Sequence, residues 1–228
     1  MADSNSVLVN ELRNVSGAVL AHARLNVEST LNALSLEMIQ QLHTALSSWS
    51  ARDDVAAIVI TGSGDKAFCA GGDIQALYRA ISANHAAGKV VDAYPFEFFE
   101  QEYRLDYALH TCAKPVITIG HGIVMGGGLG ILGASRFRVL SEKSRLAVPE
   151  ITIGLFPDAG ASWTLKNMPG HYASWLGMTG SHILAADGLA TGMGTHVVAH
   201  AGRDALVQDL SQFAWRNDAE ADAQMIEE

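Results

Sequence analysis

The chain has 228 residues, of which 49% are hydrophobic and 17% are charged, a composition typical of a globular protein and not of a disordered one. Its net charge of −9 and the absence of any run of Lys or Arg argue against nucleic acid as a partner. The longest apolar stretches are too short and too rich in glycine to span a membrane. The negative net charge of the protein does not attract an anionic substrate, so the binding of such a substrate would depend on a local group of positive charge.

Strand and helix patterns alternate along the chain. Polar and apolar residues alternate over 7–13, a turn follows at 14–17, and residues 18–25 predict a returning strand. From Leu34 the apolar positions fit one helical face as far as Trp49. The next expected elements are a buried strand (56–61), a glycine-rich loop (62–72), a helix from Ile74, an aromatic helix from Pro95, a buried strand (115–120), a tight turn opening a helix (125–130), a strand (137–140), an extended piece around Pro149 (146–153), helices beyond Asp158 and a short strand (196–199). This order predicts an α/β fold with two glycine-rich loops at strand ends, where ligands of such folds commonly bind.

The cysteines and the first residues indicate a compartment. Cys69 and Cys112 belong to no CxxC motif or Cys/His cluster, which is typical of thiols in a reducing environment. Residues 1–6 show neither the basic nor the apolar region of a secretory signal. We expect a cytoplasmic protein, with the mitochondrial matrix as the alternative if a targeting segment has been removed.

The two glycine-rich loops are the first candidate functional feature. They contain the sequences KAFCAGGDI, from Lys66 to Ile74, and HGIVMGGG, from His121 to Gly128. Glycines allow another group to approach the backbone closely, and N–H groups at a helix start carry partial positive charge. If the loops converge, two N–H groups form an oxyanion hole for a thioester enolate or a tetrahedral oxygen. The alternative is that Gly126–Gly128 only permits close helix packing. Neither loop is a GxxxxGK[ST] phosphate loop or a convincing GxGxxG dinucleotide motif.

Three segments resemble the signature segments of the crotonase superfamily of acyl-CoA enzymes. They are AFCAGGDI, GHGIVMGGGLG and AVPEITIGLFPDAG, and their order and separations also match. The resemblance covers most of the chain, from about residue 7 to about residue 199. It implies a crotonase-like spiral of repeated ββα units with a helical C-terminal part. It also implies that the N–H groups of Gly72 and Gly127 form the oxyanion hole. The other substrate-binding positions that it implies are Ala70, Gly126 and Asp73, the last also as the cap of the following helix.

The carboxylates decide which chemistry such a fold performs. Hydratases of this superfamily use two glutamates, and the position of the first, three residues beyond the oxyanion glycine of the second loop, is Gly130 here. The second is present as Glu150, so typical water addition is not expected. Asp158 lies where hydratases usually carry glycine. GLFPDAG together with Gly130 resembles the 3-hydroxyisobutyryl-CoA hydrolase branch, whose FF-x-x-EY segment points to Glu102 as a substrate contact.

These residues predict hydrolysis of a short 3-hydroxyacyl-CoA, similar to 3-hydroxyisobutyryl-CoA, to the free acid and CoA. Glu150 would attack the carbonyl carbon or activate a water, while Asp158 orients the 3-hydroxyl group. Partial burial near Val148, Ile151 and Phe156 is expected to raise the pKa of Glu150. Two other functions stay open: an enoyl-CoA hydratase or isomerase that uses Glu150 alone, and a non-catalytic CoA-binding subunit.

Each carboxylate also has a structural alternative. Glu150 could be a surface charge, Asp158 an N-cap for a helix starting near Ala159, and Glu102 a solvated helix charge. The sequence contains no HExxH motif, so we expect no metal. CoA enters as part of the substrate, so we expect no separate cofactor.

Domain organisation and partners follow from the resemblance. Residues 1–200 are predicted to form the catalytic core, and residues 201–228 the start of a C-terminal helical region that is cut short, because full-length members of the hydrolase branch continue well beyond this length. A homo-oligomer, a trimer or a multiple of it, is implied. The other expected partner is the acyl-CoA substrate. Neither nucleic acid nor a membrane is expected as a partner.

Overall fold

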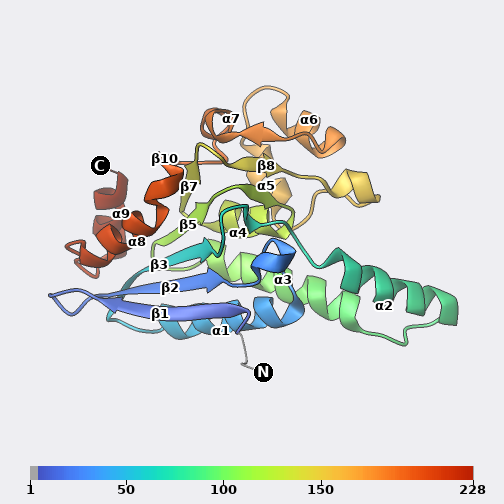
Figure 1. Cartoon of the computed structure of the whole chain (residues 1–228), viewed down its shortest axis with the longest axis horizontal. Coiled ribbons are helices and arrows are strands. Elements are labelled where there is room, and N and C mark those ends of the chain that lie inside the picture. The colour runs from blue at the N-terminus through green and yellow to red at the C-terminus, as the bar shows by residue number, and fades with distance from the viewer. Residues whose placement is uncertain (1–4, 228) are drawn as a thin grey trace.

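Two β-sheets organise the chain in the computed structural model, which describes residues 5–227 (Figure 1). Residues 1–4, most of the segment considered for a secretory signal, and residue 228, the end of the predicted C-terminal region, lie outside the described part. The larger sheet has the strand order β1 (Val7–Arg13), β2 (Val19–Leu25), β3 (Val55–Gly62), β5 (Val116–Gly120), β7 (Phe137–Ser141) and β10 (His196–Val198). The smaller sheet has the order β4 (Ala67–Cys69), β6 (Ile123–Met125), β8 (Arg145–Ala147) and β9 (Ile183–Leu184).

Three pairs of strands follow one another along the chain: β3 with β4, β5 with β6, and β7 with β8. Each pair gives one strand to each sheet. β3, β5 and β7 lie side by side and parallel in the larger sheet, while β4, β6 and β8 do the same in the smaller one. A helix follows the first two pairs, α2 (Ile74–Ala87) after β4 and α4 (Gly127–Ala134) after β6. This arrangement confirms the predicted α/β fold with its spiral of ββα units. Because β4 and β6 are parallel neighbours, their carboxyl ends meet at one edge, and the glycines that follow them, Gly71–Gly72 and Gly126–Gly128, lie there.

Helices cover both faces of the larger sheet, and each face has its own apolar core. Val19, Ala21 and Ala23 of β2 pack into the core that α1, α3 and α4 share, whereas Leu20 faces the core completed by α8 and α9. The remaining helices are α1 (Leu36–Ser50), α3 (Tyr94–His110), α5 (Ala161–Lys166), α6 (Tyr172–Thr179), α7 (Ala185–Ala190), α8 (Arg203–Gln212) and α9 (Ala219–Glu227), with 3-10 turns η1 (Glu28–Thr30), η2 (Glu150–Ile153) and η3 (His200–Gly202). Strand β2 is thus buried on both sides, which is why its sequence is apolar almost throughout.

The structure differs from the predicted elements in several places, among them the short strands β6 and β9, where the sequence predicts no strand. The expected extended piece over 146–153 is wrong: β8 ends at Ala147, and Glu150–Ile153 form a 3-10 turn. Pro149 has no N–H to continue a strand ladder, so the chain turns there. The predicted loop over 62–72 contains the strand β4. Helix α1 begins at Leu36, because the Ser35 hydroxyl accepts a hydrogen bond from the Met38 N–H at 3.1 Å.

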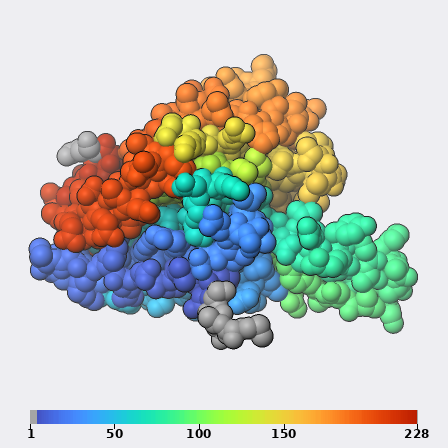
Figure 2. Space-filling model, in the orientation of Figure 1, coloured from blue at the N-terminus to red at the C-terminus, as the bar shows by residue number. Residues whose placement is uncertain are grey.

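The outline of the molecule is uneven. Helix α2 and the beginning of α3 extend from one end of the body, opposite the end where α8 and α9 lie (Figures 1 and 2). Within residues 5–227, every helix is too short or too polar to cross a bilayer. The interior turns of α3 run back under α4, so α3 connects the protruding end with the region between the two glycine-rich loops.

Candidate active site

The two glycine-rich loops meet backbone to backbone. Gly71 and Gly126 have φ values of +106° and +51°, a region that residues with a side chain rarely adopt. A methyl group on Gly71 would lie 3.3 Å from the Met125 carbonyl oxygen and 3.7 Å from the Gly126 α-carbon. The loops can therefore approach this closely only because both positions are glycine.

Two backbone N–H groups at this junction are free. Neither Gly72 nor Gly127 donates its N–H to an acceptor within residues 5–227, although neighbouring amides such as that of Asp73 do so. Gly127 is the first residue of α4, a position whose N–H has no acceptor within its own helix and carries partial positive charge. Both glycines line one cleft. The arrangement has the two backbone donors that an oxyanion hole requires.

Close helix packing explains one of the three glycines of the second loop. A methyl group on Gly128 would lie 2.7 Å from the Cys69 β-carbon, so helix α4 can lie on β4 only with glycine at this position. Gly128 is buried. The three consecutive glycines therefore have different roles. Gly126 allows the chain to turn, Gly127 leaves its N–H free, and Gly128 allows α4 to pack on β4.

Glu102 lies in the wall of the cleft and is not a solvated charge. Its exposed fraction is 3%, and it projects from α3 so closely against Gly127 that a β-carbon on this glycine would collide with the Glu102 Oε1. Burial raises the pKa of Glu102 to about 9, and repulsion from Asp106, Asp158 and Glu150 acts in the same direction. At neutral pH this side chain is a protonated acid that can donate a hydrogen bond.

Glu150 is buried at the far side of the same cleft. It begins the 3-10 turn η2, its exposed fraction is 6%, and its Oε2 has no hydrogen-bond partner within residues 5–227. Burial raises the pKa of Glu150, and the charge of Asp158 adds to the effect. The surface-charge alternative is therefore wrong. The expected cause of burial is only partly correct: Val148 is 1% exposed, but Ile151 and Phe156 are 45% and 71% exposed.

Asp158 faces the cleft and accepts a hydrogen bond from Tyr103. The Tyr103 hydroxyl on α3 donates to Asp158 Oδ2 at 2.7 Å, which joins two segments 55 residues apart. The N-cap alternative is wrong, because Gly160 precedes α5 and no side chain caps this helix. Asp158 and Glu150 both line the cleft that contains Gly72 and Gly127.

The three other predicted binding residues have different positions. Ala70 and Gly126 line the cleft. Asp73 does not; its carboxylate accepts a hydrogen bond from the Ala76 N–H at 3.0 Å and caps α2, as the sequence predicts. Residues 5–227 hold no group of three or more His, Cys, Asp or Glu side chains placed to bind a metal ion.

Asp106 is a buried carboxyl group that sequence reasoning missed. It is 7% exposed, neither of its oxygens has a hydrogen-bond partner within residues 5–227, and burial raises its pKa to about 8, with repulsion from Asp158 adding to the rise. A β-carbon on Gly130 would lie 3.0 Å from Asp106 Oδ2. The one available signal was its position four residues after Glu102 in a helix, which places both groups on one face.

The buried acids of α3 predict a pH-dependent stability. Their folded pKa values, about 9 for Glu102 and about 8 for Asp106, are raised above the ordinary values near 4, so the folded state binds more protons at neutral pH. Their stabilising contribution is complete below about pH 4 and is lost as pH rises through 8 to 9, at up to about 1.4 kcal/mol per pH unit for each group. The free energy of unfolding, measured in urea between pH 5 and pH 9, should fall with rising pH. The fall should be less steep in the double variant Glu102→Gln/Asp106→Asn than in the unchanged chain. Glu100→Gln, an exposed position on the same helix, should leave the slope unchanged; an equal slope in all three would contradict the prediction.

Comparison with known sequences gives consistent matches. A family model described as enoyl-CoA hydratase/isomerase matches residues 20–228. A relative from Gallus gallus, named mitochondrial 3-hydroxyisobutyryl-CoA hydrolase, is 41% identical over 186 residues, which are 82% of this chain and 46% of the relative. In Arabidopsis thaliana, 3-hydroxyisobutyryl-CoA hydrolase 1 is 38% identical over 214 residues, 93% of this chain and 53% of the relative. The chain thus spans about half the length of these curated relatives.

Solved structures share the same architecture. An enoyl-CoA hydratase from Rhodobacter sphaeroides matches with a TM-score of 0.80 and 33% identity, covering 90% of this chain and 58% of that one. A carnitinyl-CoA dehydratase from Mycobacterium thermoresistibile matches with a TM-score of 0.82 and 31% identity, covering 91% and 57%. The resemblance therefore extends over nearly the whole described chain in both sequence and fold.

Proposed function

Because the chain belongs to the enoyl-CoA hydratase/isomerase family, we propose that it hydrolyses the thioester of a short 3-hydroxyacyl-CoA, similar to 3-hydroxyisobutyryl-CoA. One observation carries the proposal: Glu150 lines the same cleft as Gly72 and Gly127, whose N–H groups are free. A thioester carbonyl between the two N–H groups would present its carbon to Glu150. The hydrolase names of the relatives support this reaction.

The chemical step follows from the placement of these groups. The carbonyl oxygen gains negative charge as its carbon is attacked, and the N–H groups of Gly72 and Gly127 stabilise that charge. Glu150 either attacks the carbon itself, giving an anhydride that water then cleaves, or removes a proton from the attacking water. In both cases one water is consumed, the carbon–sulfur bond breaks, and CoA leaves as a thiolate that takes up a proton. Burial favours the proton-accepting role, because it raises the pKa of Glu150 towards neutrality.

The acyl group would be recognised through its 3-hydroxyl. Asp158 is fixed by Tyr103 at the cleft wall and can accept a hydrogen bond from this hydroxyl, while protonated Glu102 can donate one to it. Ala70 and Gly126 would contact the thioester portion. This polar pair at the acyl end favours a hydroxylated acyl group over a plain alkyl chain.

Gly130 supports a hydrolase over a hydratase. A β-carbon at this position would lie 2.8 Å from the Ala159 carbonyl oxygen and 2.9 Å from the Ala159 β-carbon, so no side chain fits. The first glutamate of the hydratase pair is absent, and the space for it is filled. Water addition across a double bond would have to use Glu150 alone.

One assay separates this proposal from the two alternatives. The protein is incubated with 3-hydroxyisobutyryl-CoA or with crotonyl-CoA in the presence of a thiol reagent. Release of free CoA from the hydroxyacyl substrate is expected. Loss of the enoyl absorbance of crotonyl-CoA without free thiol would show a hydratase instead, and no reaction with either substrate would favour a non-catalytic CoA-binding subunit.

Substitution of Asp158 tests the recognition of the hydroxyl group. We expect Asp158→Asn to lower kcat/KM for 3-hydroxyisobutyryl-CoA by roughly 10- to 200-fold, because a charge-assisted hydrogen bond contributes about 1.5–3 kcal/mol. The loss should be much smaller for isobutyryl-CoA, which lacks the hydroxyl group. Tyr103→Phe frees Asp158 and should give a weaker loss with the same substrate preference. Equal losses for both substrates would assign Asp158 a role unrelated to the hydroxyl group.

The compartment, domain division and assembly are also proposals. The mitochondrial names of several relatives favour the matrix alternative over the cytoplasm. We propose that residues 1–200 are the catalytic core and that residues 201–228 belong to a C-terminal helical region. The acyl-CoA substrate is the proposed ligand, and a homo-oligomer is the proposed assembly, as the family resemblance implies.

A further inference from the structure

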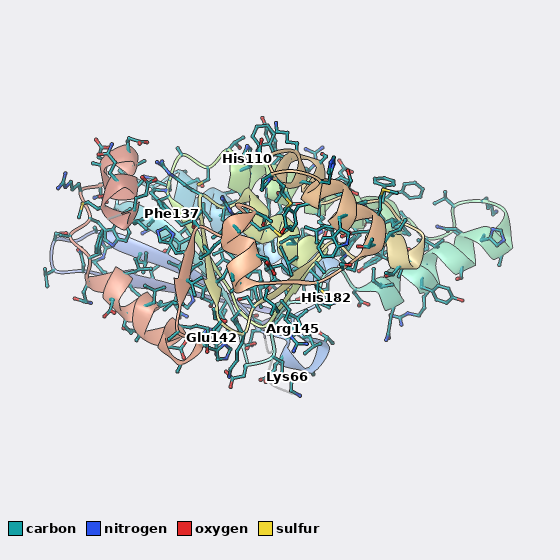
Figure 3. All side chains as sticks on the ribbon, turned by 90° about the horizontal axis from the view of Figure 1, so that it is seen from above. Lys66, His110, Phe137, Glu142, Arg145 and His182 are labelled. Carbon is teal, nitrogen blue, oxygen red and sulfur yellow. The ribbon has the colours of Figure 1, made fainter. Side chains whose placement is uncertain are left out.

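Residues 31–34, which we call the connector, join the 3-10 turn η1 to helix α1 and run beside the first glycine-rich loop. Figure 3 shows η1, in blue, near Lys66, where this loop begins. The Ala70 N–H of the loop donates a hydrogen bond to the Leu31 carbonyl oxygen at 3.1 Å. The connector thus accompanies the loop that carries Gly72, although helix α1 and strand β3 separate the two segments in the sequence.

Leu34 of the connector is paired with the loop on both sides of Gly72. Its N–H donates to the Gly71 carbonyl oxygen at 2.8 Å, and its own carbonyl oxygen accepts a hydrogen bond from the Asp73 N–H at 2.8 Å. The two bonds are those of a parallel bridge between Leu34 and Gly72. The two neighbours of Gly72 are therefore held in place, while the N–H of Gly72 itself has no acceptor among residues 5–227 and Gly72 lines the cleft.

The side chain of Leu34 extends to the second glycine-rich loop. It is 1% exposed, and its Cδ1 would lie 2.9 Å from a β-carbon on Gly127. The backbone of Leu34 thus holds the loop of the first proposed oxyanion donor, Gly72, and its side chain packs against the residue that carries the second. The position of one N–H group relative to the other therefore depends on this leucine.

A buried amide anchors the connector, whose backbone is unusual. Asn32 is 0% exposed; its Oδ1 accepts a hydrogen bond from the Val27 N–H at 3.0 Å, and its Nδ2 donates to the carbonyl oxygens of Ser63 at 3.0 Å and Ala67 at 3.1 Å. Leu31 and Asn32 have φ values of +57° and +54°, in the left-handed region that residues with a side chain rarely adopt. Residues persist in this region where the surrounding contacts determine their conformation, and such residues concentrate at active sites.

We propose that Leu34 is a positioning residue of the oxyanion hole, which holds the N–H groups of Gly72 and Gly127 in the relative positions that stabilise charge on a thioester oxygen. Asn32 keeps the connector in the conformation that this requires. The inference rests on the proposed function and deepens it, because it names the residue that aligns the two proposed donors. An apolar side chain with no reactive group thus acts on the reaction through the two glycines.

Truncation of Leu34 provides the kinetic test. Leu34→Ala keeps both backbone hydrogen bonds but removes the carbon atoms that pack against Gly127, so the second donor can move relative to the first. We expect kcat for 3-hydroxyisobutyryl-CoA to fall by about 10- to 100-fold with KM nearly unchanged, because a displacement of about 1 Å is enough for a loss of this size. Leu34→Met restores the length of the side chain and should recover most of kcat.

Leu20→Ala is the matched control. Leu20 is 0% exposed, but it belongs to the other apolar core, on the opposite face of the larger sheet. Its truncation should lower Tm by a similar amount and leave kcat and KM unchanged. If Leu34→Ala does not fold, Leu34→Val takes its place, since valine also lacks the δ-carbons and leaves a smaller cavity. An unchanged kcat in the truncated Leu34 variant, or equal losses of kcat in this variant and in Leu20→Ala, would overturn the proposal.

Infrared spectroscopy tests the alignment of the donors without turnover. The probe is 3-hydroxyisobutyryl-CoA, isotopically labelled at its thioester carbonyl and bound to Glu150→Gln, in which hydrolysis is slowed. Two aligned donors polarise the carbonyl and lower its stretching frequency, and this lowering should be smaller in Leu34→Ala/Glu150→Gln. An equal lowering in both variants, or none in either, would overturn the proposal even if the protein is an active hydrolase. Conversely, a chain that releases no CoA refutes the proposed function, while a carbonyl frequency that depends on Leu34 would still support the positioning role.

Discussion

Glu150→Gln is expected to lower the rate of CoA release from 3-hydroxyisobutyryl-CoA by at least about 10²- to 10⁴-fold, the range that a general base contributes. Glutamine has nearly the same shape as glutamate, but it cannot accept a proton at neutral pH and is a very poor nucleophile. Although Glu150 is 6% exposed, the substitution should preserve the fold because the two side chains occupy the same space. Substrate should therefore still bind with nearly the original Kd.

The measurement combines thiol release with equilibrium binding of the substrate. Glu100→Gln is the matched control, since Glu100 is an exposed glutamate that pairs with Arg104 at the surface of α3. It should retain full activity. Near-normal turnover in Glu150→Gln would remove Glu150 from the chemical step, whereas loss of both binding and turnover would indicate a structural role.

Gly127→Ala is expected to reduce kcat by about 10²- to 10³-fold, the usual loss when one oxyanion donor is displaced. The added methyl group would meet the Glu102 carboxyl group and would lie 2.9 Å from Leu34 Cδ1, so the start of α4 must shift away from both. The N–H of residue 127 moves with it. The effect should appear in kcat more than in KM, because the hydrogen bond strengthens as charge develops on the oxygen.

Two further glycine variants make this result interpretable. Gly202→Ala is the control, since its methyl group would approach no atom closer than 3.6 Å. Gly72→Ala tests the other donor, and its methyl group would meet only the ring of Phe98, at 2.8 Å. If Gly127→Ala folds with an unchanged Tm and retains full kcat, the assignment of the oxyanion hole is wrong.

The sequence predicted the larger elements because their signal is local. The continuous apolar runs of β3 and β5 and the helical spacing of α1 each identify an element without knowledge of its neighbours. The two- and three-residue strands β4, β6, β8 and β9 have no such signal. These strands form only when successive units of the fold pack side by side, so no local sequence pattern identifies them.

The site was partly predictable for the same reason. Motif segments carry Gly72, Gly127, Glu150 and Asp158, and the structure places all four on one cleft. The hydrogen bond between Tyr103 and Asp158 joins parts of the chain that no local pattern relates. The position of Asp106 against Gly130 likewise depends on how α3 crosses α4, which the sequence does not encode in any short segment.

The crowding around Gly130 has an evolutionary consequence. Even one carbon added at this position would meet the Ala159 backbone and the Asp106 carboxyl group. A single codon change therefore cannot add a carboxylate at this position without disturbing the packing. The loop before α5 and the buried acid on α3 would have to change together with residue 130. Gly130, Ala159 and Asp106 are therefore expected to change together, because a larger residue at position 130 alone would destabilise the fold.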